Sequence, residues 1–588
     1  MKNYIKVIFG LDLRSLALFR ISVGLILIVD YFSRIIYVKD FYSDNGVLPR
    51  FQAMKDALEF SLSIHFISGL WQIQFILLTI LLICAVFLVI GYKTRIATVF
   101  CWFLVMSIGN RNIWVDSGAD QLLRLLLFWS IFLPLGARYS IDSLRTYANK
   151  IVNHHFSLAT FAFVVQLHFM YLFTAIFKFD PHWVKDGSAV YYALQSYIFI
   201  TPFGHFLNTY FSWSFGYLTR IVYLIEAFGF FFLYFPYKTQ VIRIIAILIF
   251  ISMHIGFGLG MYLGIFSFVV IAGFIALLPH TFWEILKKLT RSNKQQSLTI
   301  YYDNDCGFCI KAVHFFQTFL FLFNLRLIPA QRDKYIELEM NREESWIVVD
   351  QKGNRYYRYE GILPIIKTSP LLFYVYPLAT NTIISKIGNL TYKYVAQHRK
   401  QICPIVKVKI PDSDTHKKLK YFILNGFIVC CLIFITWHNI RTVFPTLIPE
   451  PPKDFSQIAF LIGLHQRWNM FAPYPSLENY WLVIPGRLSN NQYVDLFYYG
   501  QPVSYENPFY SNKHFQDARW AKYLSNLIAN KGPQYENYAK YLCRKWNGTH
   551  GKEEQLLDMK FYLMQQKISL DGKEEPVSKS YFFWWRCV

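Results

Sequence analysis

Two cysteines, Cys306 and Cys309, have the spacing of a redox-active dithiol. They stand in Asp303-Asn-Asp-Cys306-Gly-Phe-Cys309, after the strand-like run Leu298–Tyr302 and before a helix-like segment that reaches Leu322. A thiolate at a helix N-terminus is stabilised by the helix dipole and by unpaired backbone N–H groups. We therefore expect Cys306 to be the more acidic, attacking thiol. Cys309, one turn later, is expected to be buried and to resolve the mixed disulfide.

The alternative for this pair is half of a zinc site. A ribbon or finger site needs a second Cys or His pair at a suitable spacing. The candidates that follow, Cys403 and His416, are poor substitutes. The spacing therefore favours redox chemistry without a metal.

Two ionisable residues associated with apolar segments are candidates for a second site. Lys178 follows the apolar segment Leu158–Phe177 without a polar break. Such a lysine usually extends to the lipid headgroups, but an apolar pocket would favour its neutral amine, which could act as a general base. His254 lies in the middle of another apolar segment, where a lone histidine is costly and is therefore a candidate site residue.

Arg124 also lies within an apolar segment and needs a partner or a wet cavity. Asp120, one turn earlier, is one candidate partner, and Glu226 in a later segment is the other. A purely structural ion pair is the alternative to a role in a site.

The elements that position these residues are apolar segments and segments with the composition of an ordinary soluble protein. The chain of 588 residues is 54% hydrophobic and only 16% charged, whereas a soluble chain carries about 25% charged residues. The deficit falls in Leu16–Pro279 and again in Tyr421–Trp437, which we expect to lie in a membrane. About nine segments are candidate spans, two of them short: Leu16–Tyr37, Trp71–Ile90, Ile96–Ile108, Gln121–Leu135, Leu158–Phe177, Tyr217–Phe235, Val241–Leu259, Met261–Leu278 and Tyr421–Trp437.

The net charge of +22 comes from 59 basic and 37 acidic residues. A location in the membrane explains this excess, so nucleic acid is not needed as a partner. Basic residues collect in cytoplasmic loops beside anionic lipid. With the N-terminus in the cytoplasm, one side of the membrane receives Lys93, Arg95, Arg138, Arg145, Lys150, Lys238, Arg243, Lys287, Lys288, Arg291 and Lys294. This orientation, in a cell or inner membrane, puts Cys306 and Cys309 in the cytoplasm and the tail after His438 outside.

The segment from Tyr302 to Cys309 resembles the signature of the DCC thiol–disulfide oxidoreductase family. The resemblance covers about 297–399 and implies a thioredoxin-like fold with Asp303, Cys306 and Cys309 at the site. Further strands are expected at Asn324–Pro329 and Trp346–Val349. A thiol redox partner is implied, but not its identity.

The first half resembles the horizontally transferred transmembrane domain family, which includes vitamin K-dependent gamma-glutamyl carboxylases. The similarity rests on Phe41–Pro49, Asp120–Gly136 and Lys178–Trp183. It implies that Lys178 is the base that deprotonates a quinol and that His254 lines the same cavity. The family's histidine after its asparagine pair has no counterpart in the loop Asn110–Ile113, which puts full carboxylation in doubt.

These observations predict a mainly α protein: a polytopic membrane helix bundle with an inserted thioredoxin-like α/β domain and a small C-terminal extracytoplasmic α+β region. The predicted boundaries are 1–290 for a bundle of about eight helices, 297–400 for the redox domain, 420–440 for the last span and 450–588 for the tail. Cys543 and Cys587 in the tail would face an oxidising compartment and could pair.

Three functions remain open. The first is a membrane enzyme that modifies or matures a secreted peptide or protein, with a quinone or lipid reaching Lys178 and His254. The second is a thiol–disulfide redox protein whose helices are only a scaffold or an electron conduit. The third is a transporter or channel, for which the inverted repeats typical of many transporters are not seen.

Overall fold

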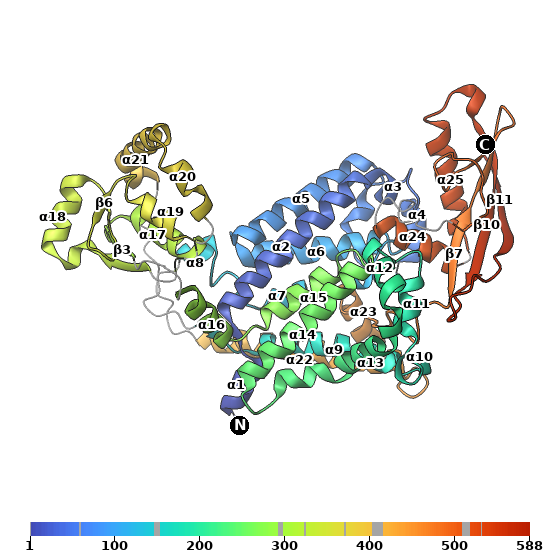
Figure 1. The fold of residues 1–588 in the computed structure, drawn as a ribbon, viewed down its shortest axis with the longest axis horizontal. Helices are drawn as coiled ribbons and strands as arrows, with labels where there is room; N and C mark the ends of the chain where they lie inside the picture. The colour runs from blue at the N-terminus through green and yellow to red at the C-terminus, as the bar shows by residue number, and fades with distance from the viewer. Residues whose placement is uncertain are drawn as a thin grey trace.

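The computed structural model describes residues 2–57, 60–145, 153–291, 298–320, 322, 325–369, 372–402, 415–507, 518–530 and 532–587. The chain is mainly helical, with 61% of its residues in helices and three small sheets. Figure 1 shows three parts along the longest axis: the segment from β3 to α21 at one end, a helix bundle in the centre, and the sheet of β7, β10 and β11 at the other end.

Six helices or helical runs are long and apolar enough to cross a membrane. They are α2 (Leu13–Ile36), α5 (Trp71–Ile90), α9 (Leu158–Phe177), the run Pro202–Tyr234 that contains α12 (Pro202–Phe211) and α13 (Phe215–Phe228), α14 (Thr239–Gly260), and Tyr421–Val443 of α22 (Thr415–Val443). A seventh is possible if α15 (Phe266–Ala276) and α16 (His280–Arg291), which meet at a bend of 93°, form one broken span.

The hydropathy pattern predicts about nine spans, and the difference lies mainly in two short helices. At 13 residues, α7 (Gly118–Ser130) is only about 20 Å long, whereas the hydrocarbon core is about 30 Å thick. The 18 residues of α6 (Thr94–Arg111) carry polar groups at both ends, including Arg95 and Asn110. A segment can therefore be apolar because protein surrounds it, without contacting lipid along a full span.

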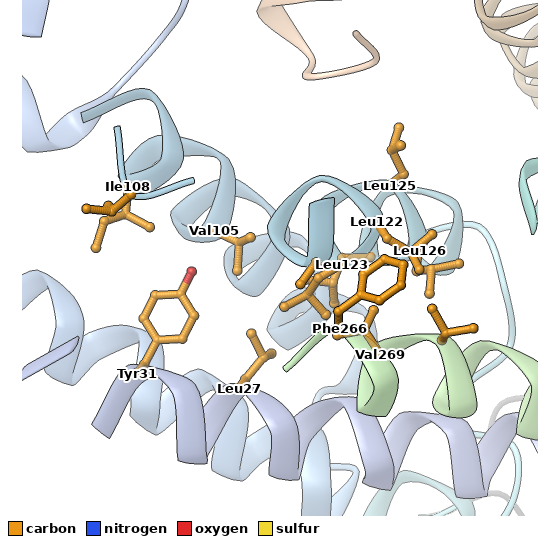
Figure 2. Packing of buried hydrophobic residues seen from close by; sticks show 14 of the residues in the cluster. Leu27, Tyr31, Val105, Ile108, Leu122, Leu123, Leu125, Leu126, Phe266 and Val269 are labelled. Atoms are coloured by element: carbon orange, nitrogen blue, oxygen red, sulfur yellow. The ribbon is translucent and has the colours of Figure 1, made fainter. Parts of the chain in front are cut away.

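The centre of the bundle shows this for α7, which is buried on nearly every face. Figure 2 shows Leu122, Leu123 and Leu126 of α7 packed among side chains of three other helices. These neighbours are Leu27 and Tyr31 of α2, Val105 and Ile108 of α6, and Phe266 and Val269 of α15. Helix α7 thus forms the interior of the bundle.

Shorter elements connect the helices of the bundle. They are α1 (Lys2–Phe9), β1 (Leu11–Asp12), α3 (Val38–Tyr42), α4 (Arg50–Asp56), α8 (Ile141–Arg145), β2 (His154–His155), α10 (Pro181–Val184) and α11 (Ala189–Gln195). Strands β1 and β2 pair antiparallel, which ties the start of α2 to the chain just before α9.

The segment after α16 forms a separate sheet with its own core. Its elements are β3 (Leu298–Tyr302), α17 (Gly307–Phe319), β4 (Leu325–Pro329), α18 (Lys334–Glu343), β5 (Ile347–Val349), β6 (Arg355–Tyr357), α19 (Ile362–Thr368), α20 (Tyr376–Ala379) and α21 (Thr382–Ile402). The strand order is β4-β3-β5-β6, with β3 parallel to β4 and the other pairs antiparallel. The predicted succession of strand, turn, helix and strand is confirmed for this segment.

The C-terminal region combines a five-stranded antiparallel sheet with helices. It contains α23 (Lys453–Leu461), β7 (Glu478–Val483), β8 (Pro485–Leu488), β9 (Tyr493–Asp495), α24 (Ala518–Ala529), α25 (Gln534–Asn547), β10 (Leu556–Lys567) and β11 (Ser578–Arg586). Cys543 and Cys587 form a disulfide, with 5.6 Å between their Cα atoms. This bond joins α25 to the residue that follows β11.

A pH effect is expected from Asp495 at the end of β9. Its Oδ1 accepts hydrogen bonds from the backbone N–H groups of Ile484 and Phe497, at 3.1 and 2.9 Å. Burial raises the pKa of Asp495 to about 6, whereas the unfolded chain titrates near 4. Because the folded state binds this proton more tightly, protonation of Asp495 stabilises the fold. The contribution is fully present below about pH 4 and is lost as the pH rises through 6.

Lowering the pH from 7 to 5 should therefore add about 1 kcal/mol through this carboxyl group. Thermal unfolding of the wild type and of Asp495→Asn across this range measures the effect, because other titrating groups are common to both proteins. Equal pH dependence in the two proteins would contradict the assignment to Asp495.

Candidate functional site

The dithiol lies at the junction of β3 and α17. Cys306 is the N-cap residue of α17, and its Sγ accepts a hydrogen bond from the backbone N–H of Cys309, with 3.4 Å between N and S. The apolar residues Leu298 and Ile300 anchor β3 in the core of the domain, and Val313 anchors α17 in the same cluster. The local packing thus holds Cys306 at the end of a helix that can stabilise its thiolate.

Asp303 and Gln331 shape the turn before Cys306. The Asp303 Oδ1 accepts a hydrogen bond from the backbone N–H of Asp305 at 2.9 Å and another from Gln331 Nε2 at 2.8 Å. The Gln331 Oε1 accepts a hydrogen bond from the N–H of Asn304 at 3.2 Å. Gln331, which follows β4, is a positioning residue that the local motif does not reveal, since it comes from a distant point in the sequence.

Both thiols are shielded from solvent. Cys306 is 3% exposed and Cys309 is 6% exposed, and both are present in the thiol form. The predicted burial of Cys309 is confirmed, and the attacking cysteine is equally covered. A large disulfide-bearing partner therefore reaches Cys306 only if neighbouring groups move.

A metal centre here would need several ligating side chains around the dithiol. Among the described residues, no group of three or more His, Cys, Asp or Glu side chains could hold a metal ion. Cys403, the poor zinc candidate from the sequence, lies outside the described residues. The arrangement is that of a dithiol site on a small α/β domain.

Comparison with known proteins agrees with this class of site. Residues 300–404 match the family described as DCC1-like thiol-disulfide oxidoreductase. The match covers this domain and does not extend to the helix bundle. No curated protein and no solved structure matches the chain. The protein therefore combines a thiol–disulfide oxidoreductase-like domain with several apolar helices suited to a membrane.

A second candidate site is a large cavity in the bundle, with a volume of about 1530 Å³. Its lining includes Arg124, Lys178, Glu226 and His254, which come from four different helical segments or their ends. Most of the remaining wall is apolar, including Leu248 and other aliphatic side chains of α14. A cavity of this kind suits an amphipathic molecule, with polar groups that fix its orientation.

Lys178 and Glu226 form a buried ion pair in this cavity. The Lys178 Nζ lies 2.8 and 3.0 Å from the two carboxylate oxygens of Glu226. The ammonium group also lies 4.3 Å from the centre of the Trp183 ring. Lys178 is therefore buried in the cavity wall, and a carboxylate lies beside its Nζ.

Breaking this pair should be costly, since one charge would stay buried without its partner. We expect Lys178→Met and Glu226→Leu each to lower the free energy of unfolding by about 3–5 kcal/mol. The double variant removes both charges and should recover most of the loss. Thermal unfolding of the three purified variants in detergent measures this coupling. Additive losses would contradict the pairing.

His254 contacts Tyr171 in the same cavity. The Tyr171 hydroxyl oxygen lies 2.6 Å from His254 Nε2, and both side chains are buried. The other ring nitrogen of His254 has no hydrogen-bond partner in the described part of the chain. His254 is thus held at one nitrogen and free at the other. Tyr171 was not identifiable from the sequence because a tyrosine in an apolar segment carries no distinctive pattern.

Neither of the carboxylates predicted as partners forms a salt bridge with Arg124 in the part of the chain that the structure describes. Glu226 is engaged by Lys178, and Asp120 pairs with Arg34 and Arg519. Arg124 instead donates a hydrogen bond to the carbonyl oxygen of His465, at 2.8 Å. Both predicted carboxylates are bound by other basic groups. One of these groups, Arg519, is 399 residues away from Asp120 along the chain.

Residues between His465 and Ser476, at the start of the tail, line the cavity together with the bundle helices. Gln166 Nε2 donates to the side chain of Gln466 at 2.7 Å, and Trp183 Nε1 donates to the Phe471 carbonyl oxygen at 3.2 Å. The tail is therefore part of the cavity wall.

Asp116, in the loop before α7, also lines the cavity. Burial together with the nearby Asp120 raises the pKa of Asp116 to about 7.

Proposed function

We propose that this protein is a membrane-held thiol–disulfide oxidoreductase that acts through Cys306 and Cys309. The observation that carries the proposal is the position of Cys306 at the N-terminus of α17, where its sulfur accepts the Cys309 N–H. The DCC1-like match over residues 300–404 supports the same chemistry.

The reaction is a pair of exchange steps. The Cys306 thiolate attacks one sulfur of a substrate disulfide, so that a Cys306–substrate disulfide forms and the other substrate sulfur leaves as a thiolate, which takes up a proton. The Cys309 thiolate then attacks the Cys306 sulfur and releases the second substrate thiol. The substrate disulfide gains two electrons, and Cys306 and Cys309 are oxidised to a disulfide. The reverse sequence oxidises a dithiol substrate.

Trapping tests this order. In a Cys309→Ser variant of the full chain, the first step should still occur, and the mixed disulfide with a substrate should accumulate on Cys306. Mass spectrometry after acid quenching and alkylation identifies the adduct. An adduct that forms equally in Cys306→Ser/Cys309→Ser would overturn the proposal, because it would come from another cysteine.

We also propose that the two ends of the molecule lie on opposite sides of the membrane. Support comes from Figure 1, in which α17 and the sheet of β10 and β11 lie at opposite ends of the long axis with the apolar helices between them. The Cys543–Cys587 disulfide fits an oxidising compartment for the tail.

A second function is favoured by the cavity in the bundle. Lys178 and His254 line one space, as the similarity to the horizontally transferred transmembrane domain family implies. A bound quinol would supply an acidic hydroxyl group there. Lys178 could accept its proton after the ammonium proton has passed to Glu226, 2.8 Å away. This proton transfer is the part of carboxylase-like chemistry that the site retains, whereas the histidine missing from the loop Asn110–Ile113 argues against full carboxylation of a secreted peptide or protein.

The double variant of the Lys178–Glu226 ion pair tests this second function. Lys178→Met/Glu226→Leu should remain folded but should lose any co-purifying quinone or lipid that native mass spectrometry detects in the wild type. A folded double variant that keeps the same bound molecule would exclude the pair from ligand binding. The helix bundle would then be a scaffold or conduit for the dithiol domain.

A further inference from the structure

The dithiol domain has an apolar stripe on the outer side of α21. Four residues at helical spacing form it, and they are 57–70% exposed: Ile383, Ile387, Leu390 and Tyr394. Positions i, i+4, i+7 and i+11 fall on one face of a helix. The stripe is therefore a continuous surface rather than scattered side chains.

The opposite side of α21 already packs against the domain. The Tyr392 ring lies 5.7 Å from the ring of Trp346, and Gly388 lies against the ring of Tyr359. The exposed stripe is consequently not the core-facing side of the helix. Further aromatic and aliphatic groups are exposed just before α21, on and beside α20, which contacts α21: Phe373, Tyr374, Val375 and Leu378.

The charge of this region is of one sign. No acidic residue occurs from position 361 to 411, whereas basic residues recur throughout. Lys386 and Lys393 are exposed and lie on one flank of the stripe, where their stems can extend along apolar surface and their ammonium groups can meet phosphates. A cationic flank beside an apolar face is typical of helices that lie in the interface of an anionic membrane.

Another helix of the same domain provides a contrast. Helix α18 also exposes two large apolar residues, Tyr335 and Leu338. It carries Glu337, Glu339 and Glu343 among them, which an anionic surface would repel. Figure 1 shows α18 at the outer end of the domain and α20 on the side nearer the helix bundle.

We propose that the stripe of α21, with the exposed residues of 373–378, rests on the anionic lipid leaflet beside the bundle. Along the chain, the domain follows α16 and precedes α22, whose residues Tyr421–Val443 are a candidate membrane span, so it is tethered close to the membrane. Helix α17 also contacts α8 of the bundle. Lipid contact through α21 would be a second attachment, and it would hold the domain at a fixed tilt. The connection to α22, a candidate membrane span, brings an anionic leaflet within reach of this cationic flank, and this favours lipid over a soluble acidic partner.

Photolabelling of the full chain in nanodiscs tests the proposal. One nanodisc contains phosphatidylcholine alone and the other contains about one third phosphatidylglycerol, and each carries a trace of lipid with a diazirine on its acyl chain. Adducts should map to residues 383–394 in the anionic nanodisc, several-fold above phosphatidylcholine alone. The α18 peptide should stay at background in both.

Variants separate lipid contact from other causes. Ile387→Glu/Leu390→Glu should reduce α21 labelling to background, whereas the matched Tyr335→Glu/Leu338→Glu should leave it unchanged. Lys386→Gln/Lys393→Gln, a mild surface change, should remove the gain from phosphatidylglycerol. Equal labelling of α21 and α18 would overturn the proposal. So would α21 labelling that falls as the protein self-associates, because a second copy would then be the occupant.

Discussion

Replacing Cys306 by serine should reduce disulfide exchange by the full chain to the uncatalysed rate. The attacking group is a thiolate, and a serine hydroxyl at the same position does not ionise near neutral pH and forms no disulfide. The Cys306 sulfur accepts a hydrogen bond from Cys309 N–H, which a serine oxygen can also accept, so the fold should tolerate the change. Reduction of a small model disulfide such as oxidised glutathione measures the effect.

The two cysteines should respond differently. Cys309→Ser should still react once and then stop at the mixed disulfide, because Cys309 is needed only for resolution. Cys431 offers a matched control, since it is also a buried free thiol but lies in the apolar helix α22. Cys431→Ser should leave exchange unchanged. Residual turnover in Cys306→Ser that depends on Cys309 would reverse the assigned roles.

The second large effect is expected from Arg519→Ala in α24. Arg519 and Arg34 share two carboxylates, Asp30 and Asp120, in a closed, buried network. The Arg519 Nη2 lies 2.7 Å from Asp30 and 2.8 Å from Asp120. Removing Arg519 leaves two buried carboxylates with a single cation, which should cost at least about 3–5 kcal/mol of unfolding free energy. Thermal unfolding in detergent measures the loss.

A surface ion pair provides the control for this variant. Arg487, in β8, pairs with Asp558 but is partly exposed, so Arg487→Ala should change the unfolding midpoint little. Because Arg519 joins the tail to α2 and α7, its loss should also expose the tail to limited proteolysis. If Arg519→Ala unfolds at the same temperature as Arg487→Ala, the tail is not held to the bundle by this network.

Local features of the sequence predicted the dithiol domain well. The strand, turn and helix around Cys306 depend on residues within a short stretch, so periodicity and spacing contain the necessary information. The apolar helices were equally visible. Their number was not, because the hydropathy of α7 resembles that of a membrane span while its length and packing make it an interior helix.

Long-range pairing could not be predicted. Arg124 was matched to Asp120 because the two are one turn apart, but Asp120 is bound by Arg34 and by Arg519, 399 residues away. The insertion of the segment around Phe471 into the cavity wall is another such case. Charge and hydropathy identify groups that need partners, but only the packing of distant segments decides which partners they receive.

The most direct test of the account is a redox titration of the purified full chain. The protein is equilibrated in glutathione buffers of increasing potential, quenched with acid and alkylated, and the thiols are counted peptide by peptide. We predict one two-electron transition in which Cys306 and Cys309 are lost together as a disulfide, while Cys543–Cys587 stays bonded throughout. Thiols at 306 and 309 that remain reduced, or that gain only glutathione and never a mutual disulfide, would contradict an oxidoreductase built on this pair.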